Sequence, residues 1–112
     1  LFGRNGESPM PVIAATSPTN CFDAAYYASK MALEHMTPVV LLTDAFVANG
    51  SGAFKLPDLN DYPDICPPYV TPEMAGSYTP YMRNPDTQVR YWAIPGQEVS
   101  FACRESGPNS GA

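Results

Sequence analysis

The fold is decided by the stretch MPVIAATSPTNCFDAAYY, residues 10–27, in which a short apolar run leads directly into a helix start. The run up to Ala15 has the length and composition of a buried strand. Ser17 can accept hydrogen bonds from the free amides of a first helical turn, and Pro18 sits where its missing N–H costs nothing. The sequence therefore predicts a strand followed at once by a helix.

The predicted helix extends to Thr37-Pro38, because the residue before a proline is pushed out of the helical region. Its main apolar face is expected to consist of Phe22, Ala25, Tyr26, Ser29, Ala32, Leu33 and Met36. A second, softer stripe consists of Ala24, Tyr27, Ala28, Met31 and His35. A helix that is apolar over so much of its circumference needs cover on two sides.

A second apolar run, residues 39–42, follows the helix and ends at Thr43-Asp44. Two strands joined by a crossover helix form a parallel pair, and parallel sheets are buried on both faces. We therefore expect an α/β fold with one βαβ unit, residues 11–44, that makes up part of a larger parallel sheet. Two strands cannot supply such a sheet, so the chain is expected to be a piece of something larger.

The second half of the chain has little periodicity and carries nine of the thirteen prolines. Prolines at this density prevent any long helix or central strand. About fifty residues without regular structure are unusual inside a compact domain, so this segment is expected to wrap over a surface or to link two domains. We expect three regions: the βαβ region at 1–50, a proline-rich irregular connector at 51–98, and a divergent flexible tail at 99–112.

Composition argues against several classes of protein. The net charge is −5 and the six basic residues are scattered, which disfavours nucleic-acid binding. No apolar run is long enough to cross a membrane. The three cysteines are far apart without CxxC spacing, which argues against a disulfide framework, a zinc site or a cluster ligated by this chain. This cysteine usage favours a reducing compartment, and we expect a cytoplasmic location.

Few residues suggest chemistry. Asp44 ends a strand at the edge where open α/β sheets place ligands, although an aspartate there also caps or turns the next segment. Arg4 and Asn5 lie in a glycine-bracketed loop that could approach a substrate, with a surface turn as the simpler interpretation. His35 is expected to interact with the last carbonyls of the helix. Aromatic residues in segments 78–83 and 90–96 are expected to anchor the connector to its own domain.

Several motifs in register carry a resemblance to a known family. They are Gly3 to Pro9, Val12 to Ala15, Cys21 to Ala25, Thr37 to Asp44, Ala48 to Ser51, Lys55 to Leu59 and Trp92 to Gly96. Together, over about residues 2–97, they resemble the α subunit of 2-oxoacid:ferredoxin oxidoreductases, and best its 2-oxoglutarate branch. The chain departs from the family pattern at Gly52-Ala53-Phe54 and again after Glu98.

The resemblance implies an enzyme that decarboxylates a 2-oxoacid on thiamine diphosphate, reduces ferredoxin through an iron–sulfur cluster and delivers the acyl group to coenzyme A. The chain would be the end of the pyrimidine-side thiamine-diphosphate-binding domain and the connector that follows it. The partner β subunit would hold the diphosphate, its magnesium ion and the cluster, so this chain alone should bind no cofactor.

The family's activating glutamate lies upstream of the matched portion, so neither Glu7 nor Glu34 inherits that role. No catalytic residue and no metal ligand is assigned, and the isolated chain is expected to be inactive. The alternative is a non-catalytic α/β interaction module whose proline-rich arm wraps a partner.

Overall fold

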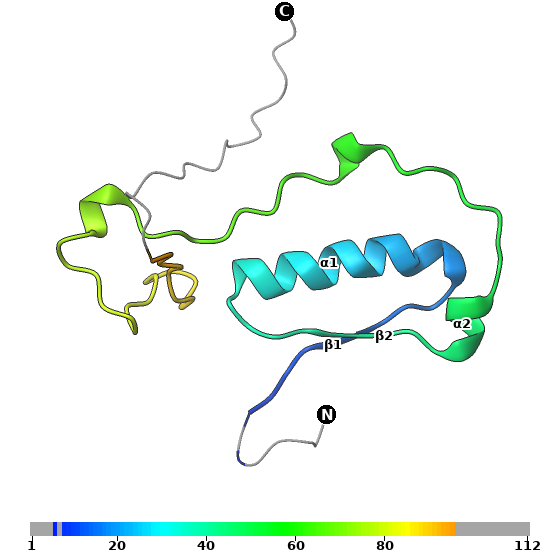
Figure 1. Cartoon of the computed structure of the whole chain (residues 1–112), viewed down its shortest axis with the longest axis horizontal. Helices are drawn as coiled ribbons and strands as arrows, with labels where there is room; N and C mark the ends of the chain where they lie inside the picture. Colours follow the sequence, from blue (N-terminus) through cyan, green and yellow to red (C-terminus); the bar gives the residue numbers. More distant parts are fainter. Residues whose placement is uncertain (1–5, 7, 96–112) are drawn as a thin grey trace, which may run out of the picture.

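The structure is a computed structural model that describes Gly6 and residues 8–95. Its helices and strands are β1 (Val12–Ala14), α1 (Cys21–Glu34), β2 (Val40–Leu42) and α2 (Ala45–Asn49). Strands β1 and β2 pair in parallel, with Val12 opposite Val40 and Ala14 opposite Leu42, and α1 crosses between them (Figure 1). The predicted α/β fold with one βαβ unit is confirmed.

Helix α1 begins as the sequence predicts. The side chain of Ser17 accepts from the Asn20 N–H at 3.2 Å and caps a short 3-10 turn, η1 (Pro18–Asn20), that leads into α1. The helix ends at Glu34, before the predicted boundary at Thr37. Met36 takes a left-handed conformation with φ of 48°, and this residue breaks the helix before the proline can act.

The most buried side of α1 contains Ala24 and Ala28, which the sequence placed in the second, softer stripe and not on the main apolar face. Ala24 and Ala28 are 5% and 8% exposed, whereas Phe22 and Leu33 of the expected main face are 40% and 38% exposed. Short side chains let neighbouring backbone approach closely, but a sheet of two strands is too narrow to cover the larger ones. The βαβ unit therefore leaves much of its central helix uncovered.

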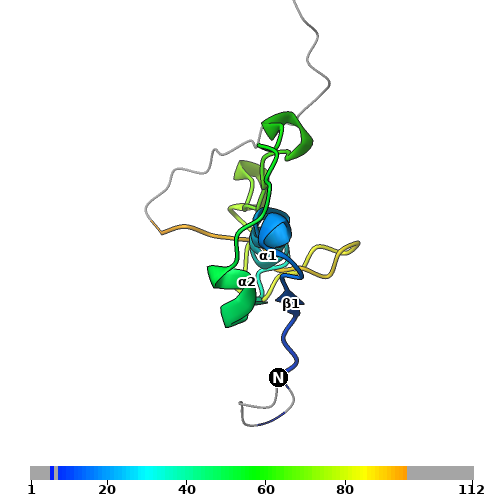
Figure 2. The same ribbon diagram turned by 90° about the vertical axis from the view of Figure 1, so that its right-hand side faces the viewer.

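The connector supplies part of that missing cover. Its described part, residues 51–95, turns back after α2 and runs along α1 on the side away from the sheet (Figures 1 and 2). It contains two 3-10 turns, η2 (Leu59–Asp61) and η3 (Pro72–Met74), and ends in a cluster of loops, residues 65–95, which we call the loop lobe. The prediction of a long irregular segment is confirmed for these residues, and the predicted tail at 99–112 lies outside the described residues.

Trp92 fastens the loop lobe to the end of α1. Its indole N–H donates to the Leu33 carbonyl at 3.0 Å, a group of the last helical turn that has no partner within the helix. Its backbone N–H donates to the Pro68 carbonyl at 2.7 Å. The expected anchoring role of the aromatic residues is confirmed for Trp92 and is wrong for Tyr81, which is 81% exposed.

Helix α2 is a feature that the sequence did not predict, because its five residues are too few for a periodic pattern. Gly50 directly follows α2 and lies close to Phe46 of α2 and to Pro18 of η1. Within the described ranges, no helix combines the length and the apolar character that crossing a membrane requires.

Replacing Gly50 with alanine should loosen the contact between α2 and η1. A Cβ atom on Gly50 would lie 2.7 Å from the Phe46 carbonyl oxygen and 3.1 Å from Cγ of Pro18, so the backbone must shift. We expect a local destabilisation of about 1–3 kcal/mol. Hydrogen exchange of the amides of residues 19–20 and 45–49 in the full chain measures this loss, as exchange that is about fivefold to a hundredfold faster.

Gly52→Ala is the matched control. Its added Cβ would come no closer than 3.4 Å to Cγ2 of Thr19, an ordinary contact, so protection should stay within about 0.5 kcal/mol of the parent chain. Equal protection in the two variants would contradict the proposed packing of Gly50.

Candidate functional site

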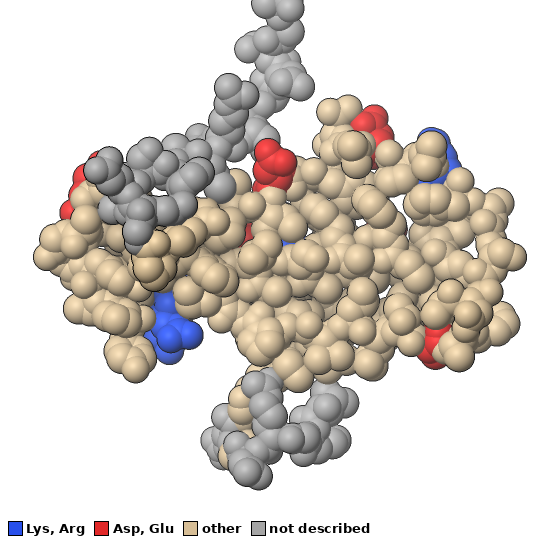
Figure 3. Space-filling view, viewed as in Figure 1, with Lys and Arg blue, Asp and Glu red and all other residues tan. Residues whose placement is uncertain are grey.

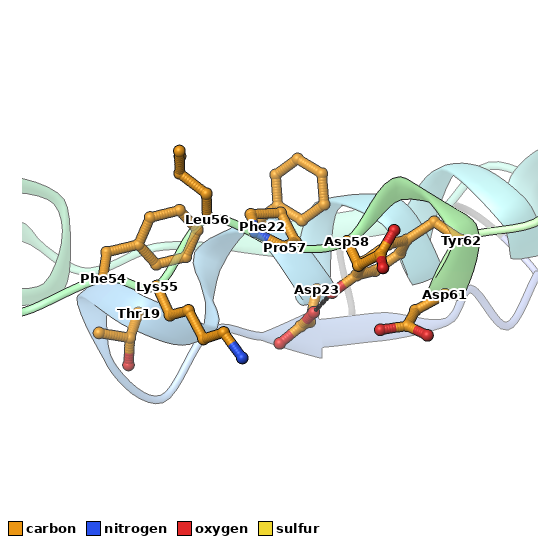
Figure 4. A pocket seen from close by; sticks show the side chains of 10 residues that line it. All are labelled: Thr19, Phe22, Asp23, Phe54, Lys55, Leu56, Pro57, Asp58, Asp61 and Tyr62. Atoms are coloured by element: carbon orange, nitrogen blue, oxygen red, sulfur yellow. Dashed lines mark hydrogen bonds between the residues drawn. The ribbon is translucent and has the colours of Figure 1, made fainter.

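An open groove of about 490 Å³ lies between the start of α1 and the connector (Figure 4). Its lining residues come from η1, the first turn of α1 and the segment around η2; they are Thr19, Phe22, Asp23, Phe54, Lys55, Leu56, Pro57, Asp58, Asp61 and Tyr62. Three carboxylates and one ammonium group make it acidic. The groove therefore joins residues that are far apart in the sequence.

Tyr62 joins the connector side of the groove to helix α1. Its hydroxyl donates to the Asp23 carboxylate in the first turn of α1. Its ring meets Phe22 and Tyr26 edge to face, with centroids 5.1 Å and 4.9 Å away, a geometry that aromatic quadrupoles favour. The Tyr26 hydroxyl donates to the Pro63 carbonyl at 2.6 Å, which adds a second tether beside the first.

Two aspartates shape the connector side of the groove. Asp58 caps η2, because its Oδ1 accepts from the Asn60 N–H at 2.9 Å and from the Asn60 side-chain amide at 2.8 Å. Asp61 lies within the same 3-10 turn. Asp58 is therefore held by its hydrogen bonds to Asn60. No three metal-ligating side chains come together among the described residues.

The hydrogen bond to Asp23 is the largest cause that raises the pKa of Tyr62, from 10.0 to about 12, followed by desolvation and by the charge of Asp23. An ionised Tyr62 would lose its donor proton and face a carboxylate. The phenol therefore stays protonated near neutral pH, where it serves as a hydrogen-bond donor and not as a base.

The residues that the sequence singled out are not brought together here. Oδ1 of Asp44 accepts from the Val47 N–H at 2.7 Å and caps α2, which agrees with the simpler interpretation of this residue. The backbone N–H of His35 donates to the Met31 carbonyl at 3.1 Å at the end of α1. Arg4 and Asn5 lie outside the described residues.

Sequence reasoning missed the groove itself. The pair that closes it, Asp23 and Tyr62, is separated by 39 positions, so no local spacing reveals it. The usable signal was the cluster of aromatic residues on α1 at 22, 26 and 27 together with a tyrosine in the connector.

Substituting Asp23 with asparagine should lower the pKa of Tyr62 from about 12 toward 10.0, because it replaces the carboxylate with a weaker, neutral hydrogen-bond acceptor and removes the charge of Asp23. A pH titration of the full chain with ¹³Cζ-labelled tyrosine, assigned with Tyr62→Phe, reads this pKa directly. Asp61→Asn is the control, because the charge of Asp61 makes the smallest contribution to the raised pKa of Tyr62, and its removal should change that pKa far less.

The raised pKa also fixes the pH range in which the contact stabilises the fold. A group whose pKa is higher in the folded state contributes its full stabilisation below the unfolded value and loses it above. For Tyr62 that contribution should be complete below pH 10.0 and vanish as the pH rises through about 12. An unchanged titration in Asp23→Asn would contradict this account.

Comparison with known proteins identifies the family. Residues 1–110 match the family described as pyruvate flavodoxin/ferredoxin oxidoreductase, thiamine diphosphate-binding. Over 96 residues the chain is 44% identical to 2-oxoglutarate oxidoreductase subunit KorA of Mycobacterium tuberculosis. The alignment covers 86% of this chain and 14% of that relative.

No solved structure matches the chain. The resemblance read from the motifs is confirmed by the match over residues 1–110 and by the 44% identity to KorA. The chain belongs to the thiamine diphosphate-binding family of pyruvate flavodoxin/ferredoxin oxidoreductases.

Proposed function

We propose that the chain forms part of the α subunit of a 2-oxoglutarate:ferredoxin oxidoreductase. Such an enzyme oxidatively decarboxylates 2-oxoglutarate, transfers the acyl group to coenzyme A and passes electrons to ferredoxin. The observation that supports this proposal is the 44% identity to a 2-oxoglutarate oxidoreductase subunit, which extends over 86% of the chain.

The groove does not fit thiamine diphosphate with its magnesium ion. The groove presents Asp23, Asp58 and Asp61 against the single cation of Lys55, so its net charge would repel a diphosphate. No three metal-ligating side chains cluster in the part of the chain that the structure describes. In this proposal the diphosphate, the magnesium ion and the iron–sulfur cluster belong mainly to the β subunit.

The role proposed for this segment is structural. Three hydrogen-bonded tethers hold the connector to α1: Tyr62 to Asp23, Tyr26 to Pro63 and Trp92 to Leu33. They fix the path of the chain from the βαβ region, 1–50, through the connector toward the next domain of the subunit. We assign no proton transfer and no catalytic residue to these side chains.

One observation supports the alternative of a non-catalytic interaction module. Leu56 and Leu59 of the connector are 82% and 73% exposed, and apolar side chains so exposed are available to a partner. In both proposals the outer side of the connector meets another polypeptide; they differ in whether the assembly has oxidoreductase activity.

Enzyme assays of the assembled complex distinguish the two. An antibody to this chain captures the complex anaerobically from its source, and reduction of a viologen dye is followed with 2-oxoglutarate and coenzyme A. We expect activity that requires both substrates and exceeds that with pyruvate. An intact complex that is inactive with every 2-oxoacid would overturn the oxidoreductase proposal and favour the interaction module.

The isolated chain should bind thiamine diphosphate no better than background, because the groove is acidic and the cofactor site is assigned to other parts of the complex. Isothermal calorimetry with and without Mg²⁺ measures this. Saturable binding by the isolated chain would place part of the cofactor site within these residues and refute the structural role proposed here.

A further inference from the structure

Two arginines face each other at the base of a tight turn in the loop lobe. Arg83 and Arg90 are partners in an antiparallel bridge. The adjacent bond, from the Asn84 N–H to the Val89 carbonyl at 2.8 Å, makes them a non-hydrogen-bonded pair, the type whose side chains lie closest. Both side chains therefore leave the same face of the turn, with Cβ atoms about 5 Å apart.

The turn between them is built rigidly. Oδ1 of Asn84 accepts from the backbone N–H groups of Asp86 and Thr87 at 2.9 and 3.0 Å, and the Gln88 N–H donates to the Asn84 carbonyl at 2.9 Å. Gln88 takes the left-handed φ of 60° that closes the turn. The backbone positions of both arginines are therefore fixed before any partner arrives, which lowers the part of the entropy cost of binding that comes from the backbone.

The two positive charges have no acidic partner within the described residues. The one ion pair found there joins Lys30 to Glu34. No carboxylate of residues 8–95, Asp86 in the turn included, lies within 4 Å of either guanidinium. Arg83 donates to the Gln88 carbonyl at 3.1 Å, a neutral acceptor. Like charges that face each other across a bridge destabilise the fold. Two adjacent positive charges without an acidic partner are also unexpected in a chain whose net charge is −5.

The shape of the site indicates the class of partner. Small-molecule sites are concave, whereas the segment that carries the two arginines, drawn in yellow, stands away from the body of the molecule in Figure 2. In Figure 3 basic side chains, in blue, lie at the edge of the loop lobe. The backbone that carries the two arginines projects, Arg83 is exposed and Arg90 is half-buried, so their guanidinium groups are within reach of a protein surface. There each fork can bind one carboxylate with two hydrogen bonds.

We infer that Arg83 and Arg90 form a docking point for two neighbouring carboxylates on the partner subunit. This inference rests on the proposed function for the existence of that subunit. Arg90 is the residue to test, because its side chain has no structural bond among the described residues, whereas Arg83 also holds the turn.

Carbodiimide coupling tests the contact directly. In Arg90→Lys the new amine can be joined to a carboxylate that touches it, and mass spectrometry of the purified complex identifies both residues. We expect a link to an aspartate or glutamate of the partner subunit, with the native Lys30 and Lys55 as internal comparisons. No link from an intact complex, or links only within this subunit's own polypeptide, would overturn the inference.

Subunit association provides a second measurement that does not depend on activity. Arg90→Glu should weaken association at least tenfold in sedimentation experiments at low salt, and the difference should shrink as salt screens the charges. Lys30→Glu makes the same charge change away from the turn and should leave association within twofold of the parent. Association is measured without turnover, so the two proposals fail separately. A complex with no 2-oxoacid activity would refute the proposed enzyme but not the effect of Arg90→Glu on association. Equal association of Arg90→Glu and Lys30→Glu would refute the docking point.

Discussion

The width of the sheet is the constraint on which the rest of this structure depends. Two parallel strands of three residues each can cover only one stripe of a 14-residue helix, and that stripe is the pair of buried alanines, Ala24 and Ala28. Everything else on the helix has to be covered by other means. The proline-rich connector does part of this, which explains how so irregular a segment follows a defined path.

The connector is held by side chains that combine an aromatic ring with one polar group. Tyr26, Tyr62 and Trp92 each bury ring surface against the helix or its neighbours and also make one hydrogen bond. Such residues suit a segment without regular backbone pairing, because one side chain supplies both buried apolar surface and a directional hydrogen bond. The acidic groove is a by-product of this arrangement, since the same contacts bring Asp23 beside the aspartates of η2.

Local features of the sequence predicted the local structure well. Ser17-Pro18 marked the helix start, and the apolar runs marked both strands, because caps and strand composition act over a few residues. The end of α1 and helix α2 were missed, since a left-handed Met36 and a five-residue helix leave no periodic signal. The groove could not be predicted, because the pairing of Tyr62 with Asp23 is decided by the path of the connector through space.

The three tethers close loops of very different lengths in sequence. The bonds to Asp23, to Pro63 and to Leu33 span 39, 37 and 59 positions, whereas the pairing of β1 with β2, Val12 opposite Val40, closes a shorter loop. Long loops close later than local contacts because chain entropy must be lost first. We therefore expect the βαβ unit to form before the three contacts that hold the connector to α1. During synthesis on the ribosome, the helix must therefore wait, with its aromatic face bare, until the connector has emerged.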